Sequence, residues 1–348
     1  MPDPTSSLRP SALGLRQQLQ QRRILVIGPS NIGDAVLASP VVETLHRRYP
    51  QAHLTVVVGA RAKAVFTDDP RVQTLVDADL YDSAAGRLKL ALALWRHHPH
   101  IVVDLRHTLY PLLLKPLQSW RYLRQPPPAL RHMRDRHLWK LHAQAPATRP
   151  TSRQKAAALR RAVPLRFTPK DAAHVDGLWR RWQLNGERRV VLICPGARSH
   201  IKRWVLEGFA QVANRLIAEE GVEVVFSGEP DEKPVIEEIL ALMTRRAHTS
   251  VGLTTVRQLG LLMQRVALVI TNDSASLHLA SAVQAPTLAI FGPTDAGKYG
   301  PTSPRSRTLS RRLFCAPCER SLCRFSHECM RFISADEVYE AARGLLHA

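Results

Sequence analysis

Acidic and basic side chains follow two similar strand-to-loop breaks, about one domain length apart in the chain. The apolar run 24–27 breaks into a Gly-bearing loop that carries Asp34, and the apolar run 190–193 breaks into a loop that carries Arg198 and Lys202. Ligands of α/β proteins bind outside the carboxyl ends of buried parallel strands, so both loops are candidate ligand sites. A carboxylate opposite two cations has the polarity that transfer from an anionic donor to a hydroxyl group requires.

A third polar group lies at the predicted start of a helix in the second half of the chain. Asp273 and Ser274 follow the apolar run 266–270, and His278 lies one helical turn further on. Free amides and the positive end of the helix dipole make such a start a site for a diphosphate. His278 shares the helix face of Ser274 and can approach the same ligand. The same residues also fit plain N-caps and a structural histidine, and that interpretation stays open.

Two more loops of the second half carry polar residues directly after a predicted strand. Glu229 and Glu232 follow the strand 222–226, where acids can accept hydrogen bonds from ribose hydroxyls, although they also fit a helix cap. The loop 292–295, with the sequence Gly-Pro-Thr-Asp, follows the strand 287–291. Because parallel strands end at one edge of a sheet, these loops predict one shared ligand site.

The elements that must position these residues alternate between strand and helix in both halves. Predicted strands cover 24–27, 54–58, 73–76, 101–105, 190–193, 222–226, 266–270 and 287–291. Apolar residues at helical spacing predict helices over 34–48, 61–67, 86–97, 170–183, 205–219, 231–245, 255–263, 274–283 and 336–346. This alternation is typical of two doubly wound parallel sheets.

Charge is the unusual property of the composition. The 348 residues have an ordinary apolar content of 45%, but the net charge of +20 predicts an acidic partner. Residues 121–166 are densely basic, and Asp135 is their only acid, which weakens the alternative of a merely solvated charged face. No apolar run approaches the roughly 20 residues of a membrane helix, and no secretory signal opens the chain, so we expect a cytoplasmic protein.

Four of the five cysteines crowd into the last 34 residues. Their spacing, Cys-x2-Cys-x4-Cys-x5-Cys, is short enough for one tetrahedral metal site. In a cytosolic chain such clustering favours metal ligation or reduced thiols over disulfides. We therefore consider a structural zinc or iron ion, against free thiols, at Cys315, Cys318, Cys323 and Cys329.

Taken in order, the motifs resemble the ADP-heptose lipopolysaccharide heptosyltransferases, glycosyltransferase family 9. The resemblance extends from Arg23 to Leu346 and includes the cysteine segment that ends in Cys329 and Met330. The ordered set is specific, whereas each motif alone is not. Its parts are 28–44 with Asn31-Ile32-Gly33-Asp34, 195–197 with Lys202-Arg203-Trp204, Ser227-Gly228, Asp273-Ser274 with His278, and Phe291-Gly292-Pro293-Thr294.

The resemblance implies a GT-B architecture, in which two Rossmann-like domains face a cleft. We expect a tail over 1–22, an acceptor-binding domain over 23–184, a nucleotide-sugar-binding domain over 185–330 and a C-terminal helix over 331–348. It also implies an inverting, metal-independent transfer of heptose from ADP-heptose, with Asp34 as the catalytic base and Lys202 as the diphosphate contact. The donor is then expected to contact Ala197, Arg198, Ser199, Lys202, Glu229, Glu232, Asp273, Ser274, Ala275 and His278.

One position departs from the family pattern. Ala275 stands where the family usually has Gly, and a Cβ beside the phosphate is expected to shift the donor or alter the preferred sugar.

The implied acceptor is the lipopolysaccharide core, which carries carboxylates and phosphates. We expect it to contact Asn31, Gly33, Arg106, Arg131 and Arg134. The basic stretch then predicts peripheral attachment to the anionic cytoplasmic face of the inner membrane. A family member with another donor or acceptor is the alternative within the same fold.

Three other classes of protein compete with this interpretation. A basic nucleic-acid-binding protein is disfavoured because aromatics are only 6% of the chain, and Trp120, Tyr122 and Trp139 form no recognisable motif. A dehydrogenase is disfavoured because Gly28 and Gly33 do not have the spacing of a dinucleotide-binding loop. A scaffold without activity gives no reason for the positions of Asp34 and Lys202.

Overall fold

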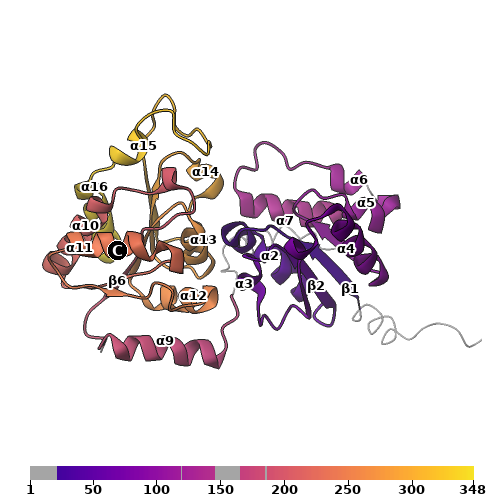
Figure 1. The fold of residues 1–348 in the computed structure, drawn as a ribbon, viewed down its shortest axis with the longest axis horizontal. Helices are drawn as coiled ribbons and strands as arrows, with labels where there is room; N and C mark the ends of the chain where they lie inside the picture. Colours follow the sequence, from indigo (N-terminus) through magenta and orange to yellow (C-terminus); the bar gives the residue numbers. More distant parts are fainter. Residues whose placement is uncertain (1–21, 119, 146–164, 185) are drawn as a thin grey trace, which may run out of the picture.

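A computed structural model describes residues 22–118, 120–145, 165–184 and 186–348. Two parallel sheets form the framework of two halves that lie side by side (Figure 1). The first sheet has the strand order β3-β2-β1-β4 and the second has the order β10-β9-β8-β5-β6-β7. Both sheets are flanked by helices, so the predicted α/β class with two doubly wound units is confirmed.

The first sheet consists of four short parallel strands. They are β1 (Arg23–Ile27), β2 (His53–Val58), β3 (Thr74–Asp77) and β4 (Ile101–Asp104). Because side chains alternate along a strand, Ile24 and Val26 of β1 pack on one face, whereas Leu25 and Ile27 pack on the other. Both faces of the sheet therefore need a covering layer.

Helices supply these two layers. On the face of Ile24 and Val26 lie α2 (Ile32–Arg48), α3 (Lys63–Phe66) and α7 (Met133–Gln144). On the opposite face lie α4 (Ala84–Arg96), α5 (Tyr110–Leu114) and α6 (Trp120–Leu123); the 3₁₀ turn Ala78–Tyr81 precedes α4, and the turn Pro116–Gln118 connects α5 to α6. The sequence pattern did not predict α5, α6 and α7, because basic residues and prolines obscure the apolar spacing there.

The second sheet is larger and entirely parallel. Its strands are β5 (Val190–Cys194), β6 (Glu223–Phe226), β7 (His248–Thr249), β8 (Leu268–Asn272), β9 (Thr287–Phe291) and β10 (Ser306–Ser310). The two-residue strand β7 and the strand β10 form its edges and were not predicted. Val191 and Ile193 of β5 pack on one face, and Val190 and Leu192 on the other.

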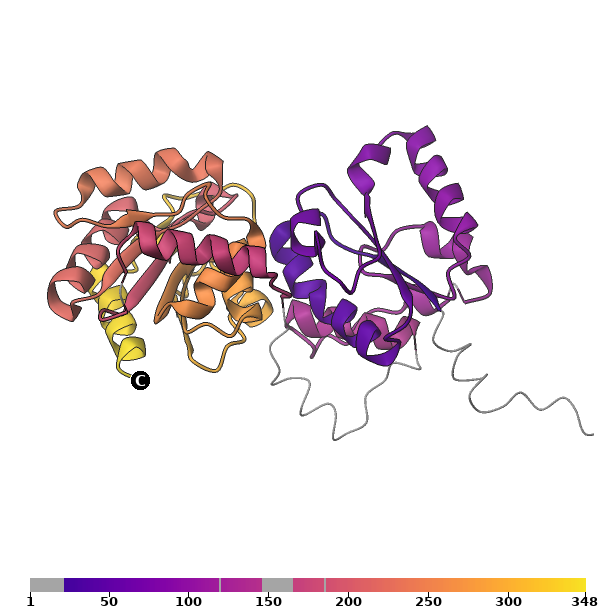
Figure 2. The ribbon, with the colours of Figure 1, turned by 90° about the horizontal axis from the view of Figure 1, so that it is seen from below.

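The helices of the second half also form two layers. One contains α10 (Leu206–Glu220), α11 (Lys233–Leu242) and α16 (Ala335–Leu346), which share one buried core. The other contains α9 (Pro169–Arg181), α12 (Val256–Arg265) and α13 (Ala275–Ala282), and α9 runs along the second half beside α12 (Figure 2). Shorter elements are α14 (Ala296–Tyr299), α15 (Glu328–Arg331) and the 3₁₀ turns His200–Lys202 and Pro230–Glu232.

The two halves meet where α2 packs against α13. Gly33 makes this approach possible, because a Cβ at this position would lie 2.9 Å from Cδ2 of His278 and 3.4 Å from Cα of Ala275. A single apolar core continues from the first sheet through α2 and α13 into the second. The start of α2 is therefore held against the start of α13. Among the described residues, no helix combines the length and apolarity needed to cross a membrane.

Candidate active site between the two halves

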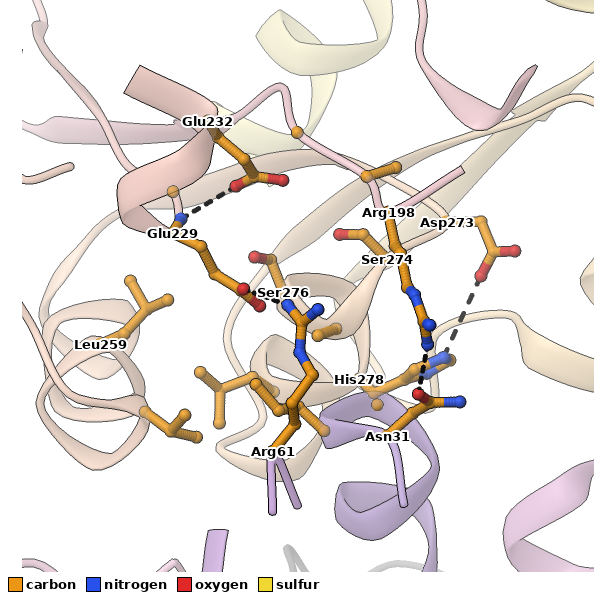
Figure 3. Close-up of a pocket in the computed structure, with 18 of the residues that line it drawn as sticks. Asn31, Arg61, Arg198, Glu229, Glu232, Leu259, Asp273, Ser274, Ser276 and His278 are labelled. Carbon is orange, nitrogen blue, oxygen red and sulfur yellow. Dashed lines mark hydrogen bonds and ion pairs between the residues drawn. The ribbon is translucent and has the colours of Figure 1, made fainter. Parts of the chain in front are cut away.

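A cavity of about 570 Å³ opens where loops from the two sheets face each other. From the first half it is lined by the start of α2 and by the loop after β2, and from the second half by loops after β5 and β6 and by the starts of α12 and α13 (Figure 3). Strand ends and helix starts thus converge on it, as expected for a ligand site of two facing α/β units.

The predicted donor residues all line this cavity. They are Ala197, Arg198, Ser199, Lys202, Glu229, Glu232, Asp273, Ser274, Ala275 and His278, and they are joined by Asn31, Gly33 and Asp34 of the first half. Residues that are more than 150 positions apart in the chain therefore surround one space. Arg106, Arg131 and Arg134, which were predicted to contact the acceptor, are not among the lining residues.

Lys202 is held at the start of α13 by Asp273. Its Nζ lies 2.7 Å from Oδ2 of Asp273, and Oγ1 of Thr294 donates a hydrogen bond of 2.6 Å to the same oxygen. The Asp273 side chain is only 4% exposed, so these two contacts compensate the cost of burying its carboxylate. The Lys202 side chain remains 31% exposed and lines the cavity, so it can still reach a ligand there.

The start of α13 keeps its backbone amides available. Ser274 is the N-cap residue, but its side chain makes no capping hydrogen bond, and the Asp273 carboxylate is bound to Lys202 and Thr294 instead. The plain N-cap interpretation of these two residues therefore does not describe the structure. Amides at the positive end of the helix dipole face the cavity beside an ammonium group, which suits a ligand phosphate.

His278 is a buried residue in the first turn of α13. Its Nε2 is 4.0 Å from Oδ1 of Asp273, and its ring is 6.4 Å from the ring of Tyr299. Burial lowers the pKa of His278 and outweighs the opposing influence of the Asp273 and Asp34 charges, so the imidazole is neutral near pH 7. A neutral ring can pack under the ligand without adding charge.

Asp34 lies in the first turn of α2, at the opposite wall of the cavity. Asn31 Nδ2 donates a long hydrogen bond of 3.4 Å to its Oδ2. Asn31 Oδ1 in turn accepts a hydrogen bond of 2.6 Å from Arg198 Nη1 of the second half. The side chain of Asn31 thereby links the carboxylate of one half to a cation of the other, and Figure 3 shows its contact with Arg198.

Two glutamates occupy the far end of the cavity. Glu232 accepts a hydrogen bond of 2.9 Å from the backbone N–H of Glu229, and burial raises the pKa of its carboxyl group. Gly196 is required beside it, because a Cβ there would overlap the Glu232 carboxylate. Glu229 pairs with Arg61 from the loop after β2. Both acids thus remain candidates for binding hydroxyl groups.

Several residues of this cavity were not predicted from the sequence. Arg61 follows β2 by three residues, so the strand-to-loop rule that found Asp34 could have found it. Tyr299, whose ring centroid lies 6.0 Å from Lys202 Nζ, carries no comparable signal. Thr255 and Leu259 belong to the start of α12 and its first turns, where the sequence shows only a helix start.

The remaining predicted arginines do not line the cavity, and Arg131 instead contacts the second half. Arg131 Nη2 is 2.6 Å from Oδ2 of Asp295 in the second half, and this contact lowers the pKa of Asp295 against the opposing effect of burial. His132 next to it contacts the backbone carbonyl of Gly300 at 3.1 Å. These contacts form a second bridge between the halves. Residues 149–161 of the basic stretch lie outside the described residues.

A family model for "Glycosyltransferase family 9 (heptosyltransferase)" matches residues 118–328, which is more than half of the chain. The chain belongs to glycosyltransferase family 9. It is therefore a glycosyltransferase of the heptosyltransferase family, as its motifs predicted, and the predicted enzyme class is confirmed.

Individual relatives support this assignment. The family 9 chain is 27% identical over 315 residues to "Lipopolysaccharide heptosyltransferase 2" of Escherichia coli K12, covering 82% of this chain and 87% of the relative. The solved E. coli ADP-heptose heptosyltransferase II has the same fold, with a TM-score of 0.70 at 23% identity over 93% of this chain and 98% of that structure. The predicted GT-B architecture is thereby confirmed.

A solved structure with lower sequence identity also shares the fold. The iron-containing dodecameric glycosyltransferase TibC of enterotoxigenic E. coli shares the fold with a TM-score of 0.56 at 12% identity, covering 94% of this chain and 79% of that structure. In the family 9 chain, Cys315, Cys318, Cys323 and Cys329 line one cavity of about 460 Å³.

These cysteines do not form a ligand set. No three His, Cys, Asp or Glu side chains within the described part of the chain are arranged to hold a metal ion, so the predicted tetrahedral site is not seen. Burial, together with the three neighbouring cysteines, raises the pKa of Cys329 to about 11, which keeps it a neutral thiol.

Proposed function

We propose that this protein transfers a heptose from ADP-heptose to the lipopolysaccharide core. One observation carries the proposal: Asp34 of the first half lines the same cavity as Lys202 and the start of α13 in the second half. A base and a site for an anionic leaving group therefore face each other across one space. The names of the E. coli relatives, a lipopolysaccharide heptosyltransferase and an ADP-heptose heptosyltransferase, supply the sugar, the nucleotide and the acceptor class.

In the proposed reaction the hydroxyl oxygen of the acceptor attacks the anomeric carbon of the heptose. The bond from that carbon to the diphosphate oxygen breaks, and ADP leaves with the electron pair. The hydroxyl attacks from the face opposite the leaving group, where Asp34 accepts its proton. The configuration at the anomeric carbon therefore inverts. General-base catalysis of this kind contributes about 10² to 10⁴ in rate.

Charge that grows on the departing diphosphate is stabilised by the second half. Lys202 supplies a positive charge, and the first amides of α13, at Ala275 and Ser276, supply donors at the positive end of the helix dipole. In this arrangement protein groups provide the stabilisation of the leaving group. The methyl group of Ala275 lies at this helix start and is proposed to influence which sugar is preferred.

The nucleoside end of the donor is proposed to lie near Glu229 and Glu232. The backbone N–H of Glu229 fixes the Glu232 carboxylate, which can accept hydrogen bonds from the ribose hydroxyls. Arg198 reaches from the same wall to Asn31, beside the base. The acceptor is proposed to approach Asn31 and Gly33 from the first half, with Arg106, Arg131 and Arg134 binding its anionic groups further out.

The net charge of +20 supports an anionic membrane surface as a partner of this enzyme, because its acceptor class is a membrane lipid. A structural zinc or iron ion at the cysteine segment stays a prediction. Its thiols would have to move closer together to hold the ion. Metal analysis of the purified protein, with Cys315→Ser as the control, tests it.

A panel of nucleotide sugars with truncated core acceptors tests the proposed function. Release of ADP or UDP is followed for the wild type and for Asp34→Ala. We expect turnover with ADP-heptose and a large loss of rate in the variant. Turnover only with another donor would replace the substrate but keep the family, whereas full activity of Asp34→Ala would overturn the mechanism.

A further inference from the structure

The outer surface of the first half is unusually apolar. Most of the exposed large apolar side chains of the described residues lie between Leu80 and Leu123, a stretch that contributes no lining residue to the cavity. Leu117 is 94% exposed and Trp120 is 56% exposed. We call the "α4–α6 surface" the patch formed by Leu88, Leu92, Trp95, Leu113, Leu117 and Trp120. Exposed large apolar side chains that gather on neighbouring helices are typical of an interaction site.

The contributing helices lie next to one another on one face of the first sheet. Leu90 and Leu94 of α4, Leu114 of α5 and Tyr122 of α6 point inward and share one buried cluster with Leu25 of β1. The opposite sides of these helices must then face outward together. Figure 1 shows α4, α5 and α6 grouped at the end of the molecule that is remote from the second half.

On α4 the exposed residues follow the helical repeat. Leu88, Leu92 and Trp95 are four and three positions apart, so they form one stripe along the helix. The inward stripe of the same helix is formed by Leu90, Ala91 and Leu94. This helix is apolar on two sides, although only one of them has a partner within the described structure.

Basic residues outnumber acidic ones in the part of the chain that carries the apolar stripe. Between Ser83 and Gln125 the only acidic residue is Asp104, which is 2% exposed, and the exposed Asp82 just before this range pairs with Arg87 at 3.2 Å. Over the same range the chain carries Arg87, Lys89, Arg96, Arg106, Lys115, Arg121 and Arg124. Arg121 lies over the ring of Trp120, with its guanidinium carbon 5.4 Å from the ring centroid.

We propose that the α4–α6 surface docks onto an anionic lipid bilayer, with its Leu and Trp side chains in the headgroup region and its Arg and Lys side chains at the lipid phosphates. Leucine and tryptophan beside basic residues is the combination that binds membrane interfaces. Long basic side chains can lie along the apolar surface and place their charges at the phosphates. The proposal rests on the membrane location of the acceptor, but not on the identity of the donor sugar.

A second copy of the chain is the less suitable occupant. Two copies that met through this surface would bring Lys89 and Arg96 of each copy close to like charges. Like-charge contacts of this kind oppose association. An anionic bilayer instead offers phosphates to the same cations and attracts them near its surface.

Vesicle flotation tests the proposal. Full-length protein is mixed with vesicles of phosphatidylcholine alone or with one third phosphatidylglycerol, at low salt and at 0.5 M salt. The variant Leu88→Gln, Leu113→Gln, Leu117→Gln removes exposed apolar contact, and the matched control Leu242→Gln, Leu322→Gln, Phe332→Gln changes exposed residues of the second half. We expect the first variant to lower binding to anionic vesicles about tenfold or more, and the control to leave it unchanged.

A second variant isolates the charge. Lys89→Gln with Arg96→Gln should lower binding roughly tenfold at low salt and less at 0.5 M salt. Equal vesicle binding by the wild type and the triple variant would overturn the proposal. So would a dimer, seen by sedimentation, that the triple variant abolishes.

Two controls keep these outcomes separate from misfolding and from the proposed function. Circular dichroism and thermal unfolding show whether the triple variant folds, and Leu117→Gln alone is the substitute if it does not. Turnover with a water-soluble truncated acceptor should stay within about twofold in all of these variants. If the triple variant keeps its turnover but does not bind vesicles, the result supports both proposals. If the wild type shows no turnover with ADP-heptose, the result contradicts only the proposed function.

Discussion

The two halves of the cavity differ in how firmly their polar groups are fixed. In the second half, Lys202, Asp273 and Thr294 form a connected set of contacts of 2.6 to 2.7 Å around a buried carboxylate. Asn272 adds a further anchor, because its side chain donates to the carbonyl of Pro195 at 2.6 Å and accepts from the N–H of Trp204. In the first half, the only side-chain hydrogen bond of Asp34 within the described parts of the chain is a long one of 3.4 Å from Asn31.

This difference indicates a division of roles. A preformed site stabilises charge without reorganisation, which suits the binding of a diphosphate. A base with few protein contacts keeps its lone pairs available for the acceptor hydroxyl. The first half therefore depends on the second to complete its site, through the contacts Asn31–Arg198, Arg61–Glu229 and Arg131–Asp295.

Removal of the base should have the largest effect. Asp34→Asn keeps the shape of the side chain but cannot accept the proton as a carboxylate does, so kcat should fall about 10² to 10⁴-fold. ADP affinity, measured by calorimetry, should stay nearly unchanged because the proposed donor site lies in the other half. Asp82→Asn, an exposed carboxylate of the same half, is the control. A loss of ADP affinity as large as the loss of kcat would contradict the division of roles.

Lys202→Ala should affect both binding and rate. The ammonium group at the start of α13 is lost, and kcat/KM should fall about 10² to 10³-fold, as after removal of one donor from a preformed electrostatic site. ADP affinity should fall as well, in contrast to Asp34→Asn. Steady-state kinetics and calorimetry measure both, and Lys202→Arg should restore part of each. Unchanged ADP affinity would mean that Lys202 does not contact the diphosphate.

The first half should also be sensitive to acid. Burial, followed by the nearby cations Lys140 and Arg136, lowers the pKa of His137 in α7 to about 4. Between this value and the unfolded value near 6.5 the unfolded chain binds the extra proton, so the free energy of unfolding falls as the pH falls. The expected loss from this group is about 2 kcal/mol between pH 7 and pH 5.

Urea unfolding at pH 7 and pH 5 measures this loss. His137→Leu should remove most of it and leave other acid-sensitive groups in place. An identical pH dependence of unfolding in the wild type and in this variant would show that His137 is not the group responsible.

The contact between Arg61 and Glu229 should have the smallest effect. Both side chains are about half exposed, and pairs of this kind contribute at most about 1 kcal/mol. Arg61→Ala should therefore change kcat/KM by less than about fivefold, with Arg87→Ala as a control away from the cavity. A larger effect would show that Arg61 contacts a substrate rather than only closing the cavity.

The sequence alone determined most of the strands, the long helices and the loops that carry the polar residues. Apolar runs such as 24–27 and 190–193 must be buried on both faces, and local spacing is enough to show this. Because parallel strands end at one edge, the strand pattern by itself assigned Lys202, Glu229 and Asp273 to one side of the second sheet. The order of the motifs also indicated the family.

Only the tertiary structure decided which loops meet. The contacts of Asn31 with Arg198 and of Arg61 with Glu229 join residues 167 and 168 positions apart, and they depend on how α2 packs against α13. Local spacing contains no information on such packing. The same holds for Arg131, whose partner is Asp295 of the second half. It also holds for the α4–α6 surface, because a leucine on a helix is equally compatible with a buried or an exposed position until its neighbours are known.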